Sequence, residues 1–265
     1  MVNQTPLVTV LIASYNHHEF IEACINSYAN QTYSNIQLIV IDDGSTDNSL
    51  NLIRELSDRY SFNFISQSNQ GLSKVLNKGI GLAQGKYFVS ASSDDIPMLD
   101  RIEKQVDLLE SRGDILICAG NHVEIDENGE VYKRQKTYDA RELTFEDIFY
   151  RKVVGVSAPT AMCSTEVLRS VGGYDSSVRL EDIYMWLKVT SHGYKIFIMS
   201  DVLAYYRKHS NNQSKNIEFM AQNLIKIYKE YSDKPLHDKM INQLLINLFA
   251  KAVQRGYPYP FKLIK

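Results

Sequence analysis

The chain has 265 residues, of which 44% are hydrophobic and 23% charged, and this predicts a folded core in one domain or in one domain with an appendage. The formal net charge of −2 gives no basic footprint for nucleic acid, so we expect no nucleic-acid partner. No apolar run approaches the ~20 residues that span a bilayer, and no basic segment followed by an apolar one opens the chain. We therefore expect a cytoplasmic protein, with peripheral contact to the inner face of a membrane left open.

Strands and helices alternate along the first 91 residues. Short apolar runs predict buried strands at 7–14, 36–41, 62–66 and 87–91. Amphipathic spacing predicts helices at 18–30, 46–60 and 71–84, the second with Thr46 or Asp47 as its N-cap. This β-α-β order predicts a parallel sheet with helices on both faces.

Polar clusters follow three of these strands: residues 14–16 (Ser-Tyr-Asn), 42–45 (Asp-Asp-Gly-Ser) and 92–95 (Ser-Ser-Asp-Asp). Ligands of such sheets bind at the carboxyl ends of the strands, so we expect the three clusters to border one crevice.

The pattern is mixed after residue 100. Helices are predicted at 100–112, 144–151, 165–171 and 181–192, and strands at 115–119 and 122–125, followed by a hairpin turn at 127–129. Two amphipathic helices are predicted between residues 216 and 255. Their apolar face is too large to stay exposed to solvent, so we expect it to pack on the preceding domain or on a second subunit in a homo-oligomer. The aromatic and basic segment 257–262 is a candidate for membrane contact. The three cysteines are far apart among apolar neighbours, which predicts buried free thiols.

Six segments resemble, in order, the motifs of glycosyltransferase family 2, which are VTVLIASYN, IDDGSTDNS, NQGLSKVLNKGIGLAQGKYF, SASSDD, GGYDSSVRLEDIYMWLKV and YRKHSNNQS. The resemblance spans roughly residues 7–214. It implies an inverting transferase with the GT-A fold, an α/β mixed sheet flanked by helices, in a catalytic domain of residues 1–215. Residues 216–265 then form a C-terminal helical appendage.

A carboxylate can accept the imide N–H of uracil, and the resemblance gives this role to Asp43, with Tyr15 against the base. The simpler alternative for Asp43 is a turn in which the aspartate caps the next helix. The resemblance also implies nucleotide-sugar contacts for a further set of residues, namely Ala13, Asn16, Asn69, Gly71, Asn77, Ser93, Asp94 and Asp95.

The family's metal motif has two carboxylates two residues apart, and here Ser92 replaces the first of them. A divalent cation stabilises the negative charge of a departing nucleoside diphosphate, and Mn²⁺ or Mg²⁺ prefers oxygen ligands. The resemblance implies that Asp94 and His209 are the metal ligands. No role is predicted for His17 or His18.

An inverting transferase needs a base to deprotonate the acceptor hydroxyl. The resemblance gives this role to Asp182, with Glu181 orienting the acceptor or its neighbours. The alternative is that either carboxylate merely caps the helix that starts there.

We therefore predict transfer of a sugar from a UDP-sugar to a glycan or lipid-linked acceptor, in synthesis of a bacterial surface polysaccharide such as O-antigen or capsule. Two alternatives stay open. A non-catalytic nucleotide-sugar-binding partner subunit would fit the loss of a carboxylate at Ser92. A nucleotidyltransferase would usually carry a glycine-rich basic loop after the first strand, which ASYNHHEF is not.

Overall fold

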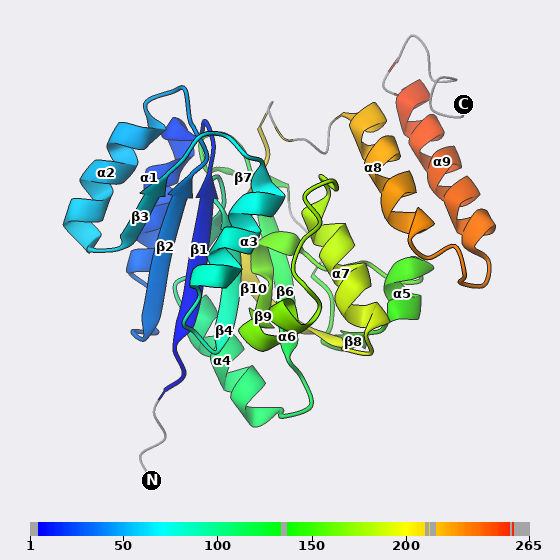
Figure 1. Ribbon diagram of the computed structural model, residues 1–265, viewed down its shortest axis with the longest axis horizontal. Coiled ribbons are helices and arrows are strands. Elements are labelled where there is room, and N and C mark those ends of the chain that lie inside the picture. The colour runs from blue at the N-terminus through cyan, green and yellow to red at the C-terminus, as the bar shows by residue number, and fades with distance from the viewer. Residues whose placement is uncertain (1–4, 134–136, 210–211, 213–215, 255, 257–265) are drawn as a thin grey trace.

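The computed structural model describes residues 5–133, 137–209, 212, 216–254 and 256 (Figure 1). The strands are β1 (Val8–Ser14), β2 (Ile36–Asp42), β3 (Asn63–Ser66), β4 (Tyr87–Ser92), β5 (Ile96–Pro97), β6 (Ile117–Ile125), β7 (Val131–Lys133), β8 (Arg141–Leu143), β9 (Met162–Ser164) and β10 (Ile196–Arg207). Within the described residues they form one ten-stranded sheet in the order β3-β2-β1-β4-β9-β6-β10-β5, with β7 beside β6 and β8 beside β10.

The helices are α1 (His18–Ala29), α2 (Ser49–Tyr60), α3 (Leu72–Leu82), α4 (Arg101–Ser111), α5 (Phe145–Phe149), α6 (Thr165–Ser170), α7 (Glu181–Ser191), α8 (Ile217–Lys229) and α9 (His237–Gln254), with a 3-10 turn, η1, at Ala158–Thr160. The predicted N-cap of the second helix is wrong. That helix begins after Asn48, and the Asp47 side chain accepts the backbone N–H of Ser49.

The first half of the sheet is parallel, as predicted. β1 lies between β2 and β4, and its register sets Ala13 opposite Ser92 and Ser14 opposite Asp42. The carboxyl ends of the three strands are therefore level, and the polar segments that follow them begin at one edge of the sheet.

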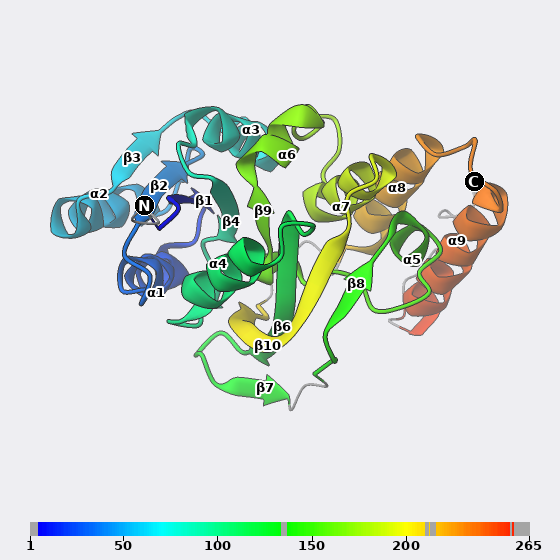
Figure 2. The same ribbon diagram turned by 90° about the horizontal axis from the view of Figure 1, so that it is seen from below.

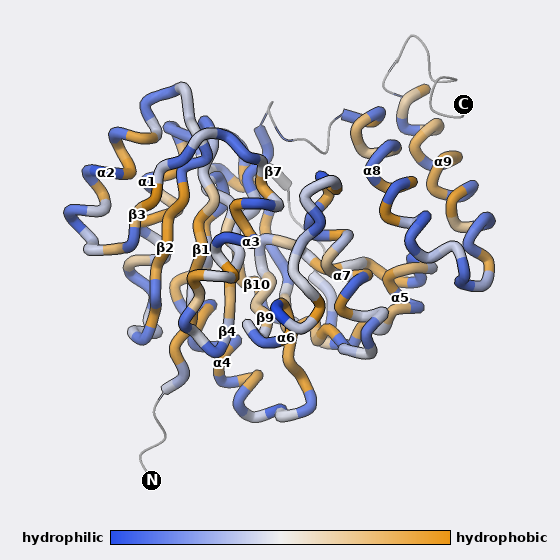
Figure 3. The backbone as a smooth tube through the Cα atoms, in the orientation of Figure 1, coloured by the Kyte–Doolittle hydropathy of each residue, from blue (hydrophilic) through white to orange (hydrophobic). Residues whose placement is uncertain are grey.

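Helices cover both faces of the sheet, which confirms the predicted layers (Figure 2). Alternate residues of β1 point to opposite sides, as a strand requires. Val10 and Ile12 pack with α1, α2 and α4, whereas Leu11 packs with α3, α6 and α7. Apolar residues accordingly concentrate on the central strands (Figure 3). Cys24, Cys118 and Cys163 are buried free thiols, as predicted.

The second half of the sheet is mixed and was predicted less well. The two strands expected at 115–119 and 122–125 are the single strand β6, which runs through Gly120. A Cβ at Gly120 would lie 2.7 Å from the Leu203 side chain, so close packing against β10 explains the glycine. β10 itself was not predicted, because polar Ser200 and Asp201 interrupt its apolar pattern where its register with β6 shifts.

The two C-terminal helices pack on the preceding domain, with α8 and α9 beside α5 and α7 (Figures 1 and 2). Leu224, Ile227 and Leu244 share a buried cluster with Phe149 of α5 and Leu187 of α7. The division into a catalytic domain and an appendage stays a prediction, as does a homo-oligomer. The aromatic and basic segment 257–262 lies outside the described residues. Among the helices that the structure describes, none combines the length and apolarity needed to cross a membrane.

Candidate functional site

The turn after β2 separates the roles of its two aspartates. Asp42 is buried and closes the turn by accepting hydrogen bonds from the backbone N–H and the hydroxyl of Ser45. Gly44 has φ +78°, and a Cβ there would lie 2.7 Å from the backbone nitrogen of Asn69, so only glycine fits. Asp42 is thus a structural residue of the turn.

Asp43 joins this turn to the loop that enters α3. Its Oδ1 accepts the Gln67 side-chain amide and the Gln70 N–H at 2.8 and 2.9 Å, and its Oδ2 accepts the Gly71 N–H at 2.8 Å. A carboxylate has roughly four acceptor positions, so the three donors among the described residues leave about one of them on Oδ2. Gly71, at φ +89°, is the N-cap of α3, so Asp43 anchors the residues that precede α3. The simpler alternative, in which Asp43 caps the next helix, is wrong, because that helix is α2 and its N-cap is Asn48.

The loop after β1 is fastened to the same turn. Asn16 has φ 55°, its N–H donates to the Ser45 hydroxyl, and its Oδ1 accepts the Thr46 N–H at 2.7 Å. Tyr15 beside it is 46% exposed. Ala13 is half-buried at the end of the core. These three residues lie together with Asp43 at the carboxyl edge.

Asn77 joins α3 to the segment before α7 by two hydrogen bonds. Its amide donates to the Tyr174 carbonyl and accepts the Tyr174 N–H, both at 2.8 Å. Asn69 is exposed on the preceding loop. The structure therefore separates the two asparagines: Asn69 is open to solvent, and both ends of the Asn77 side chain are engaged by the protein.

The segment after β4 is buried against the end of β10. Asp95 Oδ1 accepts the Arg207 N–H at 2.9 Å, and the Arg207 side chain donates to the Asp94 carbonyl at 3.0 Å. Burial, and then the neighbouring Asp94 charge, raises the pKa of Asp95 well above its usual value. Asp95 therefore holds the end of β10 in place. Ser92 is exposed, and its hydroxyl donates a hydrogen bond to Asp94.

Three side chains converge at this point, namely His17, Asp94 and His209. One potential ligand atom from each lies within 4.8 Å of the others. His209 Nε2 is 2.9 Å from Asp94 Oδ2, and both residues are at most 6% exposed. Sequence reasoning brought Asp94 and His209 together correctly but missed His17. Its position just beyond the end of β1, level with the other strand ends, was the signal that could have found it.

The charges of this cluster suit a divalent cation. Burial lowers the pKa of His17, which favours the neutral imidazole. Burial opposes ionisation of Asp94, but the His209 hydrogen bond, His17 and Ser92 together hold the pKa of that carboxyl below its usual range. Two imidazoles and one carboxylate are ordinary ligands of first-row divalent metals, so the donor set fits Mn²⁺.

Glu181 and Asp182 form the first turn of α7. The N-cap residue of this helix is Leu180, but both carboxylates lie in the first turn, where the helix dipole favours them, so the capping alternative stays open. Asp182 Oδ1 accepts the Ile183 N–H at 2.7 Å, and Glu181 Oε1 accepts the Ser73 hydroxyl at 3.2 Å. Burial raises the pKa of both carboxyls. A raised pKa brings a carboxylate closer to the range in which it serves as a general base at neutral pH.

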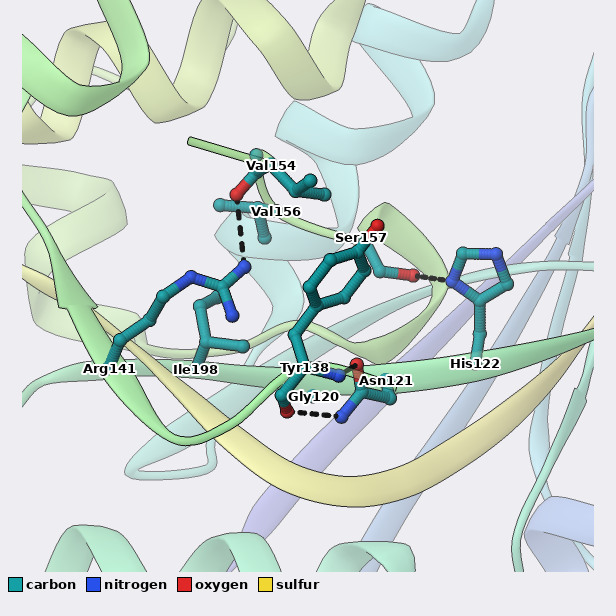
Figure 4. A pocket seen from close by; sticks show the side chains of 10 residues that line it. Gly120, Asn121, His122, Tyr138, Arg141, Val154, Val156, Ser157 and Ile198 are labelled. Atoms are coloured by element: carbon teal, nitrogen blue, oxygen red, sulfur yellow. Dashed lines mark hydrogen bonds between the residues drawn. The ribbon is translucent and has the colours of Figure 1, made fainter. Parts of the chain in front are cut away.

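A cavity of ≈ 190 Å³ lies beside β6 (Figure 4). The Tyr138 ring stands between Arg141 and His122, and Asn121 fixes the Tyr138 backbone by two hydrogen bonds of 3.0 Å. The Ser157 hydroxyl lies 2.7 Å from His122 Nδ1. The lining combines an aromatic face, a guanidinium and several hydrogen-bonding groups.

The cavity lies toward the same edge of the sheet as the polar strand ends. Cys163 of β9 pairs with both Phe88 of β4 and Ile117 of β6, so those two strands run parallel at one level. Ser93 and His122, each five residues further along, are therefore near the carboxyl edge together.

Comparison with known proteins agrees with the motifs. The model of the family described as glycosyl transferase family 2 matches residues 9–172. The chain is 26% identical over 233 residues to the putative teichuronic acid biosynthesis glycosyltransferase TuaG of Bacillus subtilis, covering 87% of this chain and 90% of TuaG. It is 27% identical over 213 residues to WfaP of Escherichia coli, a UDP-Glc:alpha-D-GlcNAc-diphosphoundecaprenol beta-1,3-glucosyltransferase, covering 79% and 80%.

Solved structures share the fold. TarS of S. aureus in complex with UDP-GlcNAc aligns with a TM-score of 0.71 at 19% identity, over 92% of this chain and 73% of that chain. The mannosyltransferase PcManGT from Pyrobaculum calidifontis, in complex with GDP-Man and Mn²⁺, aligns with a TM-score of 0.68 at 16% identity, over 99% and 79%. The sheet order, the site at its carboxyl edge and a family match over more than half of the sequence lead to one conclusion: the chain belongs to glycosyl transferase family 2 and is a glycosyltransferase with the GT-A fold.

Proposed function

We propose that the protein transfers a sugar, with inversion, from a UDP-sugar to a hydroxyl of a glycan or lipid-linked acceptor in bacterial surface polysaccharide synthesis. One observation carries the proposal. The first turn of α3 touches both halves of the site, because Gly71 donates to Asp43 while Ser73 donates to Glu181. A nucleotide bound at Asp43 would then lie next to the acidic start of α7, and this contact supports the proposal.

In the proposed reaction, Asp182 removes the proton of the acceptor hydroxyl. The acceptor oxygen attacks the anomeric carbon, the bond from that carbon to the diphosphate oxygen breaks, and UDP leaves. Asp94 and His209 would hold a divalent cation, Mn²⁺ or Mg²⁺, which supplies positive charge for the departing diphosphate. Asp43 binds the base and Tyr15 stacks on it. Membership of the family removes the nucleotidyltransferase alternative.

UDP release tests the proposal against the alternative of a non-catalytic partner subunit. The full chain is incubated with Mn²⁺ and, one at a time, UDP-glucose, UDP-N-acetylglucosamine, UDP-galactose and GDP-mannose. We expect slow hydrolysis of at least one UDP-sugar, and loss of that hydrolysis in Asp182→Asn. Hydrolysis of GDP-mannose alone would contradict the uracil assignment, and binding of UDP-sugars without turnover of any would favour the partner subunit.

Asp43→Ala is expected to weaken UDP binding by about 5- to 150-fold. An unpaired imide in a buried pocket costs about 1–3 kcal/mol, and each 1.4 kcal/mol is about tenfold. The substitution also removes the hydrogen bonds by which Asp43 holds the Gln70 and Gly71 backbone. The affinity lost through this loop should be the same for every nucleotide.

Calorimetry with UDP, CDP and GDP separates the two effects. In the unmodified protein UDP should bind best, and in Asp43→Ala the three nucleotides should become similar. Equal affinity of the unmodified protein for UDP and GDP would refute the assignment of uracil to Asp43.

The cavity beside β6 is the place that we propose for the acceptor. Arg141→Ala should raise the KM for a glycan or lipid-linked acceptor, because a guanidinium donor in the lining is lost, while hydrolysis of the UDP-sugar in the absence of acceptor is unchanged. Arg54→Ala, at an exposed position of α2, is the matched control. An equal fall of hydrolysis and transfer in Arg141→Ala would count against an acceptor-specific role.

A further inference from the structure

The proposed metal site has a serine, Ser92, where the family has a carboxylate ligand. A histidine from another strand end, His17, lies beside the two expected ligands Asp94 and His209. His17 follows β1 and is the N-cap residue of α1, with its N–H held by the Ser49 hydroxyl at 3.2 Å. Its ring lies 5.7 Å from the His209 ring, edge to face. His17 and Asp94 thus approach His209 from β1 and β4, two adjacent strands of the sheet.

The surroundings hold the His17 ring in place. The Ser93 hydroxyl, which is fully buried, lies 2.7 Å from His17 Nδ1. Histidines that bind metals commonly have one ring nitrogen fixed in this way by a neighbouring group. Phe20 packs against both His17 and His209, with ring centroids 6.1 and 5.2 Å away, and the Arg207 guanidinium covers Phe20 at 4.8 Å.

The spacing suits a cation of ordinary size. Adjacent ligands with bonds of about 2.1 Å at right angles are about 3.0 Å apart, and opposite ligands about 4.2 Å. His209 Nε2 and Asp94 Oδ2 are 2.9 Å apart, and the whole set lies within 4.8 Å, so a shift of up to about 0.6 Å brings the widest pair to the separation of opposite ligands.

We propose that His17 is the third protein ligand of this site and restores the ligand number that Ser92 removes. The proposal deepens the proposed function, on which it rests for the role of the metal. Two imidazoles and one carboxylate leave about three of roughly six positions open for diphosphate oxygens and water. The set carries a single negative charge and two nitrogen donors.

This donor set determines which metal is selected. Mg²⁺ prefers oxygen ligands and dehydrates reluctantly, whereas imidazole favours the later first-row ions. The expected order of affinity is therefore Co²⁺ above Mn²⁺ above Mg²⁺. A site with the carboxylate at position 92 and without His17 would favour Mg²⁺ more.

The test measures Mn²⁺ binding to the full chain, with and without UDP, by the electron paramagnetic resonance signal of the free ion. His17→Ala and His17→Gln should each weaken binding by about 10- to 100-fold or more, since loss of even an indirect partner of a metal ligand costs about this much. His18→Ala is the matched control, because His18 is adjacent and exposed and only its backbone N–H bonds to Asp47. Circular dichroism verifies that each variant is folded.

A rescue variant makes the result specific. Adding Ser92→Asp to His17→Ala should recover Mn²⁺ binding and raise the affinity for Mg²⁺ relative to Co²⁺. Unchanged Mn²⁺ affinity in folded His17→Ala or His17→Gln would overturn the proposal, as would equal affinity of the unmodified protein for Mg²⁺ and Co²⁺. Intact metal binding without any UDP-sugar turnover would instead contradict the proposed function and leave His17 as a ligand.

Discussion

Asp182→Asn is expected to lower turnover by about 10²- to 10⁴-fold, the usual cost of losing a general base, while UDP affinity stays within a few-fold. Asparagine keeps the size of the side chain and can still accept the Ile183 N–H, but it cannot take a proton from the acceptor hydroxyl. Steady-state turnover and calorimetry with UDP measure the two quantities separately.

Glu181→Gln is the matched control at the neighbouring position. Glu181 contacts Ser73, so its loss should change turnover less than the loss of Asp182. Near-normal turnover of Asp182→Asn, or a larger loss in Glu181→Gln, would move the role of base to Glu181.

The pH dependence of activity is an independent test of Asp182 as the base. A base works in its deprotonated form, so activity is lost as the pH falls through the pKa of Asp182. Because burial raises that pKa, the acid limb of kcat/KM should lie above the ordinary aspartate value of about 3.9. The residual activity of Asp182→Asn should lack this limb.

The parallel half of the fold was predictable because its signals are local. Each strand from β1 to β4 is a short apolar run, and each helix between them has an apolar face, as Ile53 and Leu56 of α2 show. The right-handed β-α-β rule then sets the direction of each crossover, so that the strands lie parallel. The level strand ends, with Ser14 opposite Asp42, follow from that arrangement and brought the polar clusters together.

The mixed half depends on pairings between distant segments, which no local pattern encodes. β9 is three residues long and joins β4 to β6 through Cys163. β10 pairs across a register shift, and its position sets His209 against Asp94. That contact joins residues 94 and 209, and only the family resemblance made it foreseeable.

For the site, the sequence predicted which residues take part but not which contacts they make with one another. Asn77 was expected near the nucleotide sugar, and its two hydrogen bonds to the Tyr174 backbone emerge only from the packed structure. Asp43 was assigned to the base, and its additional anchoring of Gly71 emerges only from the packed loops. His17 was left without a role because its one signal, a position just beyond the end of β1, indicates no partner until the contacts with Asp94 and His209 are known.

Asp94→Asn is expected to lower turnover by about 10³-fold or more. Asp94 is the one carboxylate in the cluster of His17, Asp94 and His209, and its pKa is depressed. It is therefore the source of the negative charge of the cluster. Charge stabilisation by a bound metal is worth several kcal/mol in the transition state, and each 1.4 kcal/mol is about tenfold in rate. Asp107→Asn, on the exposed face of α4, is the matched control and should keep full activity.

Metal titrations distinguish this explanation from a purely structural effect. With a single charge in the site, Mn²⁺ should bind weakly to the free protein and much better once the diphosphate of UDP adds its oxygens. Asp94→Asn should weaken Mn²⁺ binding in both states, and excess Mn²⁺ should recover part of the activity of His209→Ala but not of Asp94→Asn. Tight Mn²⁺ binding by the unmodified protein without UDP would contradict the charge argument. Full activity in a strong chelator would show that turnover needs no metal, and that Asp94 acts in another way.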